Sequence, residues 1–306
     1  MNMRMTDPAQ PSHMQACPFL DAATPLLSLV LATVGRSQEL VRFFESLAVQ
    51  DCSGVEVIVV DQNEDDRLAG PLALARERGI VVRHLRHTPP NLAAARNAGV
   101  QAARGQWLGF PDDDCWYGDS LLDVLKTRMT APDQPEGVII RWVEQGEPPV
   151  SLPTLSWERS AAFRDVPVAS ITLFIRRGIF DRIGGFDHRL GVGQWFGAGE
   201  ETDLIMRALR ENALVAYEPE GCVHHAFVPG QVGATAAARM AARSRARGTG
   251  ALYAKHGLSP WVILRGLVSP VARPLLKLRL GHELAHGMAV MLGRLDGWIG
   301  WLRRHQ

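Results

Sequence analysis

The chain has 306 residues, of which 46% are hydrophobic, and it carries 33 Lys or Arg against 32 Asp or Glu. This length is enough for one substantial core with an appendage, rather than for several independent domains. The four cysteines show no Cys-x-x-Cys spacing, which disfavours a zinc module or a disulfide framework and favours a reducing cytoplasm. No apolar run is long enough to cross a bilayer.

Apolar, β-rich runs alternate with helical patterns after a polar leader at 1–24, which lacks the apolar segment of a signal peptide and is expected to be flexible. Strands are expected at 26–33, 55–60 and 80–85, and helices at 39–49 and 72–78. This alternation predicts an α/β fold with a mostly parallel, Rossmann-like sheet buried on both faces. Ligands of such sheets bind at the carboxyl ends of the strands, where Thr33 and Asp61 fall. No Gly-x-Gly-x-x-Gly opens the first helix, so a dinucleotide fingerprint is absent.

A helix rich in small residues is expected next, at 91–105, and it can pack closely under a ligand. Arg96 and Asn97 stand out among its alanines. Arg96 is either an ordinary solvent-facing arginine or a guanidinium that binds a phosphate or a nucleobase edge in bidentate fashion.

Three consecutive carboxylates, Asp112, Asp113 and Asp114, follow the apolar strand-like run at 107–110. Carboxylates this close repel one another and resist desolvation unless a cation neutralises them, so a hard divalent metal is a suitable partner. The turn expected after Pro111 can bring Asp112 and Asp114 to one metal. The alternative is a solvated acidic turn.

Two later segments carry further candidate groups. Glu200, Glu201 and Asp203 begin an amphipathic helix, where carboxylates either serve chemistry or only stabilise the helix N-terminus. His224 and His225 lie in an extended segment, in which adjacent residues face opposite ways, so that at most one of them can reach a metal. The alternative for either histidine is a hydrogen-bonded core residue.

The order of these motifs closely resembles family 2 glycosyltransferases with the GT-A fold. The resemblance covers roughly residues 26–228 and rests on six motifs, each weak alone. The motifs are Thr33-x-x-Arg36, Val59-Val60-Asp61, Ala95-Arg96-Asn97-Ala98-Gly99, Phe110-Pro111-Asp112-Asp113-Asp114, Ile183-Gly184-Gly185-Phe186-Asp187 with Gly197-Ala198-Gly199-Glu200-Glu201-Thr202-Asp203-Leu204, and Val223-His224-His225. One motif departs from the family, which usually has Glu-Asp where this chain has Glu200-Glu201.

The resemblance implies a role for each donor-side residue. Thr33 and Arg36 would line the pocket of the nucleobase, and Asp61 would accept a hydrogen bond from the base or ribose. Arg96 would contact the base or the diphosphate, with Asp112 and Asp113 beside the donor.

The resemblance also implies the metal and the base. Asp112, Asp114 and His224 would hold Mn²⁺ or Mg²⁺ against the diphosphate, and a mixed carboxylate and imidazole shell suits Mn²⁺ better. Glu201 would be the general base that deprotonates the acceptor hydroxyl for inverting attack. Crowding between Glu200 and Glu201 should raise the pKa of one of them, with Asp203 one turn further along the helix.

Together these features divide the chain into a nucleotide-sugar-binding half at 25–118, an acceptor-binding and catalytic half at 119–229, and a basic helical region at 230–306. The expected activity is transfer of a sugar from a nucleoside diphosphate sugar, with uridine diphosphate as the default, to a glycan or lipid-linked acceptor in polysaccharide or glycolipid biosynthesis. A nucleotidyltransferase would use a similar metal site but attack the α-phosphate. A non-enzymatic receiver or binding module would leave Glu200 to Asp203 and His224 unexplained.

The C-terminal region carries a strong excess of positive charge. Residues 231–306 contain twelve Lys or Arg against Glu283 and Asp296. Basic residues beside tryptophans and aliphatic residues are typical of an interfacial segment, so an anionic membrane surface is an expected partner, reached from the cytoplasm. The alternative is a tail packed on the catalytic domain, and no recognised nucleic-acid module is present.

Two details of this tail are open to structural test. Trp298 and Trp301 are expected in the membrane interface with Arg303 and Arg304 at the headgroups. Helix breaks are expected at two prolines, Pro270 and Pro274.

Overall fold

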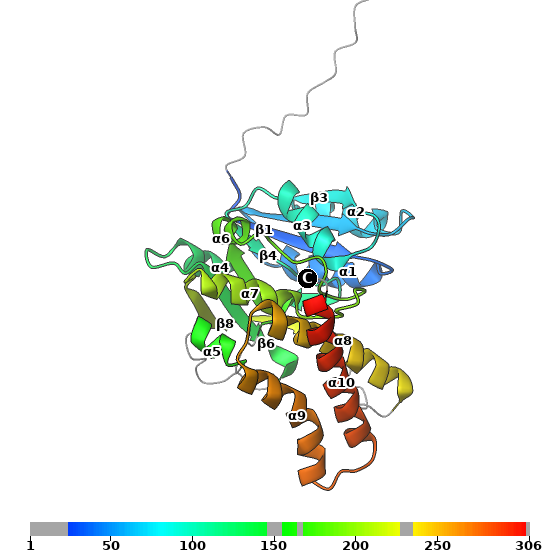
Figure 1. The fold of residues 1–306 in the computed structure, drawn as a ribbon. Helices are drawn as coiled ribbons and strands as arrows, with labels where there is room; N and C mark the ends of the chain where they lie inside the picture. Colours follow the sequence, from blue (N-terminus) through cyan, green and yellow to red (C-terminus); the bar gives the residue numbers. More distant parts are fainter. Residues whose placement is uncertain (1–23, 146–154, 164–167, 227–234, 304–306) are drawn as a thin grey trace, which may run out of the picture.

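The structure, a computed structural model of the chain, describes residues 24–145, 155–163, 168–226 and 235–303 (Figure 1). The expected leader therefore lies outside the described residues except for Thr24, and so does Arg304. The described residues form a central sheet flanked by helices, with a group of three long helices at the C-terminal end.

One eight-stranded sheet runs in the order β3-β2-β1-β4-β7-β6-β8-β5. Its strands are β1 Leu27–Thr33, β2 Val55–Asp61, β3 Val82–Arg86, β4 Trp107–Gly109, β5 Cys115–Tyr117, β6 Gly137–Trp142, β7 Leu173–Arg176 and β8 Val215–His225. The first four strands in the order are parallel, which confirms the Rossmann-like half of the expected α/β fold. The other half departs from a parallel sheet, since β7 is antiparallel to both β4 and β6, and β5 is antiparallel to β8. The sheet is therefore mixed.

The helices cover both faces of the sheet. They are α1 Gln38–Ala48, α2 Ala69–Glu77, α3 Leu92–Ala102, α4 Leu121–Thr130, α5 Trp157–Ala161, α6 Arg177–Arg182, α7 Glu200–Arg210, α8 Ala236–Lys255, α9 Pro260–Leu276 and α10 His282–Arg303, with 3₁₀ turns η1 Val143–Gln145 and η2 Ser170–Thr172. Every residue of β1 and β2 is buried, as the near-continuous apolar runs predict, and the two polar residues inside these runs, Ser28 and Glu56, are hydrogen-bonded to one another. Alternate side chains of these strands enter two cores, one under α1, α2 and α4 and the other under α3, α6 and α7.

Helix α3 lies close to the sheet because Gly99 faces it. A Cβ at this position would overlap the side chains of Val30 on β1 and Val60 on β2. The small-residue composition of this helix therefore serves close packing, and Arg96, three residues earlier, reaches Asp112 in the turn after β4.

The C-terminal helices pack in two ways. Helices α8 and α10 contact one another through glycines, and a Cβ at Gly293 or Gly297 would meet backbone carbonyls of α8. Trp301 at the end of α10 is 5% exposed and packs on Phe196, with ring centroids 5.3 Å apart. The expected insertion of Trp301 into a membrane interface is therefore wrong, because this side chain is enclosed between α8 and the loop that precedes α7.

Helix α9 runs unbroken through both prolines, contrary to expectation. A proline at position i leaves the carbonyl of residue i−4 without its helical donor. The carbonyl of Gly266, four residues before Pro270, accepts a hydrogen bond from Arg294 Nη1 of α10 instead. The carbonyl of Pro270, four residues before Pro274, lies against Gly287 of α10. Helix α10 thus supplies a donor for the first of these carbonyls and packs closely against the second. Among the helices described, none is long and apolar enough to span a membrane.

Candidate active site

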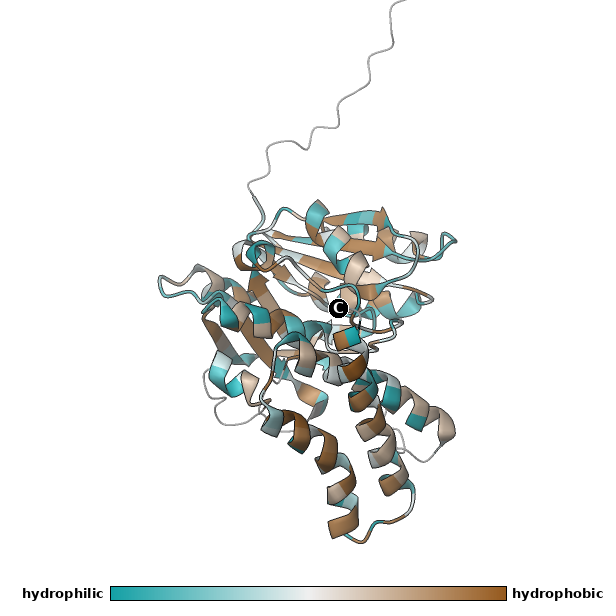
Figure 2. Cartoon of the chain, viewed as in Figure 1, coloured by the Kyte–Doolittle hydropathy of each residue, from teal (hydrophilic) through white to brown (hydrophobic). Residues whose placement is uncertain are grey.

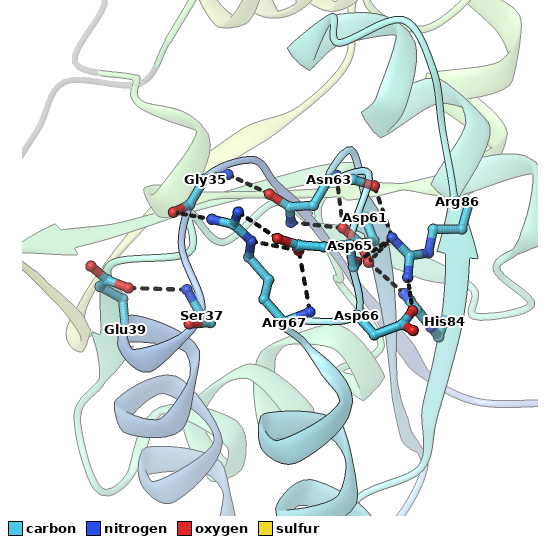
Figure 3. A network of polar contacts seen from close by, with 10 residues as sticks. All are labelled: Gly35, Ser37, Glu39, Asp61, Asn63, Asp65, Asp66, Arg67, His84 and Arg86. Carbon is cyan, nitrogen blue, oxygen red and sulfur yellow. Dashed lines mark hydrogen bonds and ion pairs between the residues drawn. The ribbon is translucent and has the colours of Figure 1, made fainter.

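A polar network joins the loops that follow β1 and β2 to side chains of β3 (Figure 3). Asp61, at the end of β2, is fully buried, and its Oδ1 accepts hydrogen bonds from the backbone and side chain of Asn63. Its Oδ2 lies 2.9 Å from His84 Nε2 and 3.2 Å from Arg86 Nη1. Asn63 in turn accepts a 2.6 Å hydrogen bond from the backbone N–H of Gly35. Both oxygens of Asp61 are thus already engaged, so this carboxylate holds the loops of the expected base pocket in place.

The aspartate cluster forms a turn directly after β4, and each member has its own partners. Asp113 accepts a 2.6 Å hydrogen bond from Thr33 Oγ1 and pairs with Arg36. Asp114 pairs with the same guanidinium at 2.7 Å. Asp112 is the most exposed of the three and lies 2.8 Å from Arg96 Nη2. The structure thus brings Thr33 and Arg36 to the acidic turn, where they orient two of its carboxylates.

Asp112, Asp114 and His225 form a group that could hold a metal ion. One potential ligand atom from each lies within 4.8 Å of the others, and His225 Nε2 is 2.9 Å from Asp114 Oδ1. The Nδ1 atom of His225 is buried and has no hydrogen-bond partner among the described residues. Two carboxylates and an imidazole form a donor set that fits Mn²⁺, and one that fits Mg²⁺ less well.

The histidine in this group differs from the one expected. Pairing of β5 with β8 places His224 opposite Trp116, on which its ring stacks at 5.3 Å, and His224 Nδ1 lies 3.1 Å from Glu144 Oε1. Because neighbours in a strand face opposite sides, this arrangement turns His225 toward Asp114. The geometry favours His225 over His224 as the candidate ligand.

Arg96 connects the acidic turn to the start of α7. The residue is 1% exposed, and its Nη2 donates to Asp112 Oδ1 and to Ser170 Oγ, both at 2.8 Å. Its Nη1 lies 3.7 Å from a carboxylate oxygen of Glu200 and 3.7 Å from one of Glu201. The interpretation of Arg96 as a solvent-facing arginine is therefore wrong. It lies between the candidate metal ligands and the candidate base.

The two glutamates at the start of α7 have different surroundings. Glu200 is 3% exposed, and its carboxylate lies against Gly191, where a Cβ would approach the carboxylate carbon within 3.0 Å. Burial raises the pKa of Glu200, and the charge of Glu201 raises it further, to about 7, although Arg96 opposes the shift. The side chain of Glu201 is 19% exposed. Of these two carboxylates, Glu201 is the one that an acceptor can reach.

Asp203 faces away from these groups. Its Oδ1 lies 3.0 Å from His256 Nε2 and 2.8 Å from Lys255 Nζ, and its Oδ2 lies 2.7 Å from Arg207 Nη2. Burial raises the pKa of Asp203, but the hydrogen bond from His256 and the charges of Arg207 and Lys255 outweigh that effect and lower it. With both oxygens engaged, Asp203 ties α7 to α8 and is poorly placed to act as a base.

A cleft of about 800 Å³ opens over the acidic turn. It is lined by Ala32, Val34, Arg36, Gln62, Pro90, Asn91, Leu92, Asp112, Asp113, Asp114, Val192, Gly193, His225 and Arg245. Sequence reasoning missed Gln62, Asn91, Ser170 and Arg245. Gln62 directly follows β2, so its place at a strand end could have identified it, whereas Arg245 comes from α8 and carries no such signal. The volume suits a ligand of drug-like to nucleotide-sugar size.

The loop that precedes α7 is held from the C-terminal side. Phe196 is buried, and Trp195 is 40% exposed, with the guanidinium of Arg247 4.9 Å from its ring centroid. A Cβ at Gly248 of α8 would overlap the backbone of Ala198, so α8 touches the chain just before Glu200. Helices α8 and α10 therefore fix the start of α7.

Comparison with known proteins agrees with this geometry. A family model described as "Glycosyl transferase family 2" matches residues 28–181. An uncharacterized glycosyltransferase of Haemophilus influenzae is 25% identical over 63% of this chain and 65% of its own length. The succinoglycan biosynthesis protein ExoO of Rhizobium meliloti is 28% identical over 66% of this chain and 61% of its own length. The matched part of this chain thus spans less than two thirds of either relative.

Solved structures share the fold at low sequence identity. A mannosyltransferase of Pyrobaculum calidifontis, solved with GDP-Man and Mn²⁺, has a TM-score of 0.63 and 14% identity, over 93% of this chain and 89% of that one. Residues 1–349 of S. aureus TarS, solved with UDP-GlcNAc, have a TM-score of 0.54 and 14% identity, over 89% of this chain and 92% of that one. These likenesses support the expected GT-A-type fold. Because the family model spans half of the chain, the chain belongs to glycosyltransferase family 2.

Proposed function

We propose that the chain is a metal-dependent, inverting glycosyltransferase, and that it moves a sugar from a nucleoside diphosphate sugar to a hydroxyl group of a glycan or lipid-linked acceptor. The observation that carries the proposal is that one buried arginine lies between a candidate metal site and a candidate general base. Asp112, Asp114 and His225 form a candidate metal site, and Glu201 offers an accessible carboxylate, with Arg96 in contact distance of both groups.

Each residue of the site has a separate proposed role. A divalent cation held by Asp112, Asp114 and His225 would neutralise the charge that grows on the departing diphosphate. Arg36, which pairs with Asp113 and Asp114, orients these carboxylates. Glu201 accepts the proton of the acceptor hydroxyl, and Arg96 holds Asp112 and the two glutamates at a fixed separation.

The donor and the acceptor are proposed from the relatives. GDP-Man and UDP-GlcNAc in the titles of the structural neighbours support a nucleoside diphosphate sugar, and Mn²⁺ in one of them supports the metal. A uridine diphosphate sugar is our first candidate. Similarity to a succinoglycan biosynthesis protein supports an acceptor in polysaccharide assembly. We propose that the enzyme works in the cytoplasm at an anionic membrane surface.

The products distinguish this activity from nucleotidyl transfer. The purified chain is incubated with Mn²⁺, a panel of uridine and guanosine diphosphate sugars, and glycan or lipid-linked acceptors. We expect free nucleoside diphosphate in proportion to glycosylated acceptor, with an inverted anomeric centre by NMR. Release of pyrophosphate would instead support a nucleotidyltransferase, and a retained anomeric configuration would refute the base assigned to Glu201.

A further inference from the structure

The turn between α9 and α10 exposes an unusual run of side chains. All eight residues from Leu275 to His282, here called the hairpin tip, are exposed. Leu276, Leu278 and Leu280 are 84%, 83% and 60% exposed, and Lys277 and Arg279 alternate with them. Single exposed leucines are ordinary on a protein surface, but a contiguous apolar patch marks an interaction site.

The apolar surface continues along α9. Trp261, Leu264, Val268 and Leu275 are between 45% and 67% exposed, and their spacing of three, four and seven residues places them along one side of the helix. In Figure 2, hydrophobic colour follows α9 down to the turn, which lies at the end of the hairpin away from the sheet. The apolar face therefore leads from the domain to the hairpin tip.

Basic groups line the inner side of the same hairpin. A groove of about 870 Å³ between α9 and α10 is lined by Ser269, Pro270, Arg273, Pro274, Arg279, His282, Glu283, His286, Gly287, Val290 and Arg294. Its one carboxylate, Glu283, pairs with Arg279 at 3.0 Å. No carboxylate of the described residues lies within 4.0 Å of Arg273. The groove therefore carries excess positive charge, which a bound anion would balance.

A second cavity of the hairpin adds to the positive charge. It measures about 390 Å³, shares Ser269, Arg273 and Arg294 with the groove, and adds Arg265. The two cavities together are lined by four arginines and one carboxylate, Glu283. Guanidinium groups gathered in this way favour a phosphate group.

We propose that the α9–α10 hairpin docks on a bilayer of anionic phospholipid, with the hairpin-tip leucines in the interface and lipid phosphates at the groove arginines. Alternation of leucine with Lys277 and Arg279 fits a surface that is apolar below and anionic above. A soluble acidic partner would account for the basic residues but not for the exposed leucines.

The proposal deepens the proposed membrane location by naming the element and the lipid group. It rests on the exposure and charge of the hairpin and not on the assignment of the reaction. Binding to vesicles and turnover of a nucleotide sugar are measured separately, so failure of one proposal can be told from failure of the other.

The test is flotation of the full chain with vesicles of phosphatidylcholine, with and without phosphatidylglycerol, at low and at physiological salt. We expect binding to the anionic vesicles only, weakened by salt. A triple variant, Leu276→Ser with Leu278→Ser and Leu280→Ser, should reduce binding at least tenfold, as should Arg273→Gln with Lys277→Gln.

The matched control replaces three exposed apolar residues of the catalytic domain, Val49→Ser with Val81→Ser and Leu214→Ser, which are 51% to 69% exposed. It should float like the unchanged chain, and thermal melting should show that every variant is folded. Equal loss in the control, undiminished flotation of the hairpin variants, or no flotation of the full chain at low salt would overturn the proposal. The proposal would also be overturned if the unchanged chain were a dimer and the leucine variant a monomer, since the hairpin tip would then bind a second copy of the chain.

Discussion

The parallel half of the sheet and the α9–α10 hairpin differ in how they use apolar and charged residues. In β1 and β2 every side chain is buried, and each carboxylate of the acidic turn that follows β4 has a cationic partner. In the hairpin tip every residue is exposed, and Arg273 in the adjoining groove has no acidic partner among the described residues.

The carboxylates of the acidic turn are thus paired within the described residues, whereas the hairpin presents apolar and positively charged side chains that no described residue covers. The loops around the acidic turn are fixed by internal contacts, as pre-organised ligand sites are. The hairpin leaves apolar area and positive charge unsatisfied, which is typical of surfaces that bind something else. The start of α7 is in contact with the C-terminal helices. Helix α8 touches the backbone of Ala198, and Lys255 of α8 pairs with Asp203.

The largest effect is expected at Glu201. Replacing it by Gln keeps its size but removes the base, so turnover should fall by roughly a hundredfold or more, while donor binding is unchanged. The measurement is release of nucleoside diphosphate in the presence of acceptor, with Glu211→Gln, an exposed glutamate just after the same helix, as control. Turnover near that of the unchanged chain would remove Glu201 from the role of base.

A matched glycine pair tests the comparison of the two regions. A Cβ at Gly99 would overlap Val30 and Val60, whereas a Cβ at Gly281 in the hairpin tip meets no atom within 4 Å. Gly99→Ala should lower the free energy of unfolding by about 1–3 kcal/mol, the usual cost of overpacking, in spite of alanine's better helix propensity. Gly281→Ala should change it by less than about 0.5 kcal/mol. Urea unfolding of both variants measures this, and equal effects would contradict the contrast in packing.

A smaller effect concerns the pH dependence of stability. The pKa of Glu200 is about 7 in the folded chain against an ordinary 4.5, so between these values the folded state keeps a proton that the unfolded state has lost. Its contribution to stability therefore declines as pH rises from about 4.5 to 7, with a slope of at most about 1.4 kcal/mol per pH unit. The groups that face it are Glu201, Arg96 and Asp112.

Glu200→Gln removes this titration. The variant should lose less stability than the unchanged chain between pH 5 and 7, as measured by urea unfolding at several pH values. Parallel curves for the two proteins across this range would show that Glu200 is not held protonated by its surroundings.

Much of the parallel half could be predicted from the sequence. Near-continuous Val, Ile and Leu runs identify β1 and β2 because both faces of these strands are buried, and polar residues at strand ends, such as Thr33 and Asp61, identify the ligand edge. Strands β6 and β7, and the pairing of β6 with both β7 and β8, could not be predicted, since they depend on contacts between segments far apart in the chain.

The site shows the same limit. Alternation along a strand says that only one of His224 and His225 can face the metal, but the choice is made by the register of β8 against β5. The local pattern makes Asp203 a catalytic candidate. Its carboxylate is in fact engaged by Lys255 and His256, which lie more than fifty residues away and cannot be inferred from that pattern. Likewise, α9 continues through two prolines where α10 packs against it, and Arg294 of α10 donates to the carbonyl that Pro270 leaves free. In each case a contact between distant segments determines the outcome, and the local sequence pattern does not specify that contact.

The central claim is that Asp112, Asp114 and His225 bind a metal that in turn binds the donor diphosphate. Thermal melting with uridine or guanosine diphosphate, each with and without Mn²⁺, tests it directly, because a ligand of the folded state raises the melting temperature. We predict that the nucleotide stabilises the unchanged chain and His224→Ala only when Mn²⁺ is present, and that Asp114→Ala and His225→Ala lose this effect while remaining folded. Undiminished Mn²⁺-dependent stabilisation of Asp114→Ala and His225→Ala would contradict the account.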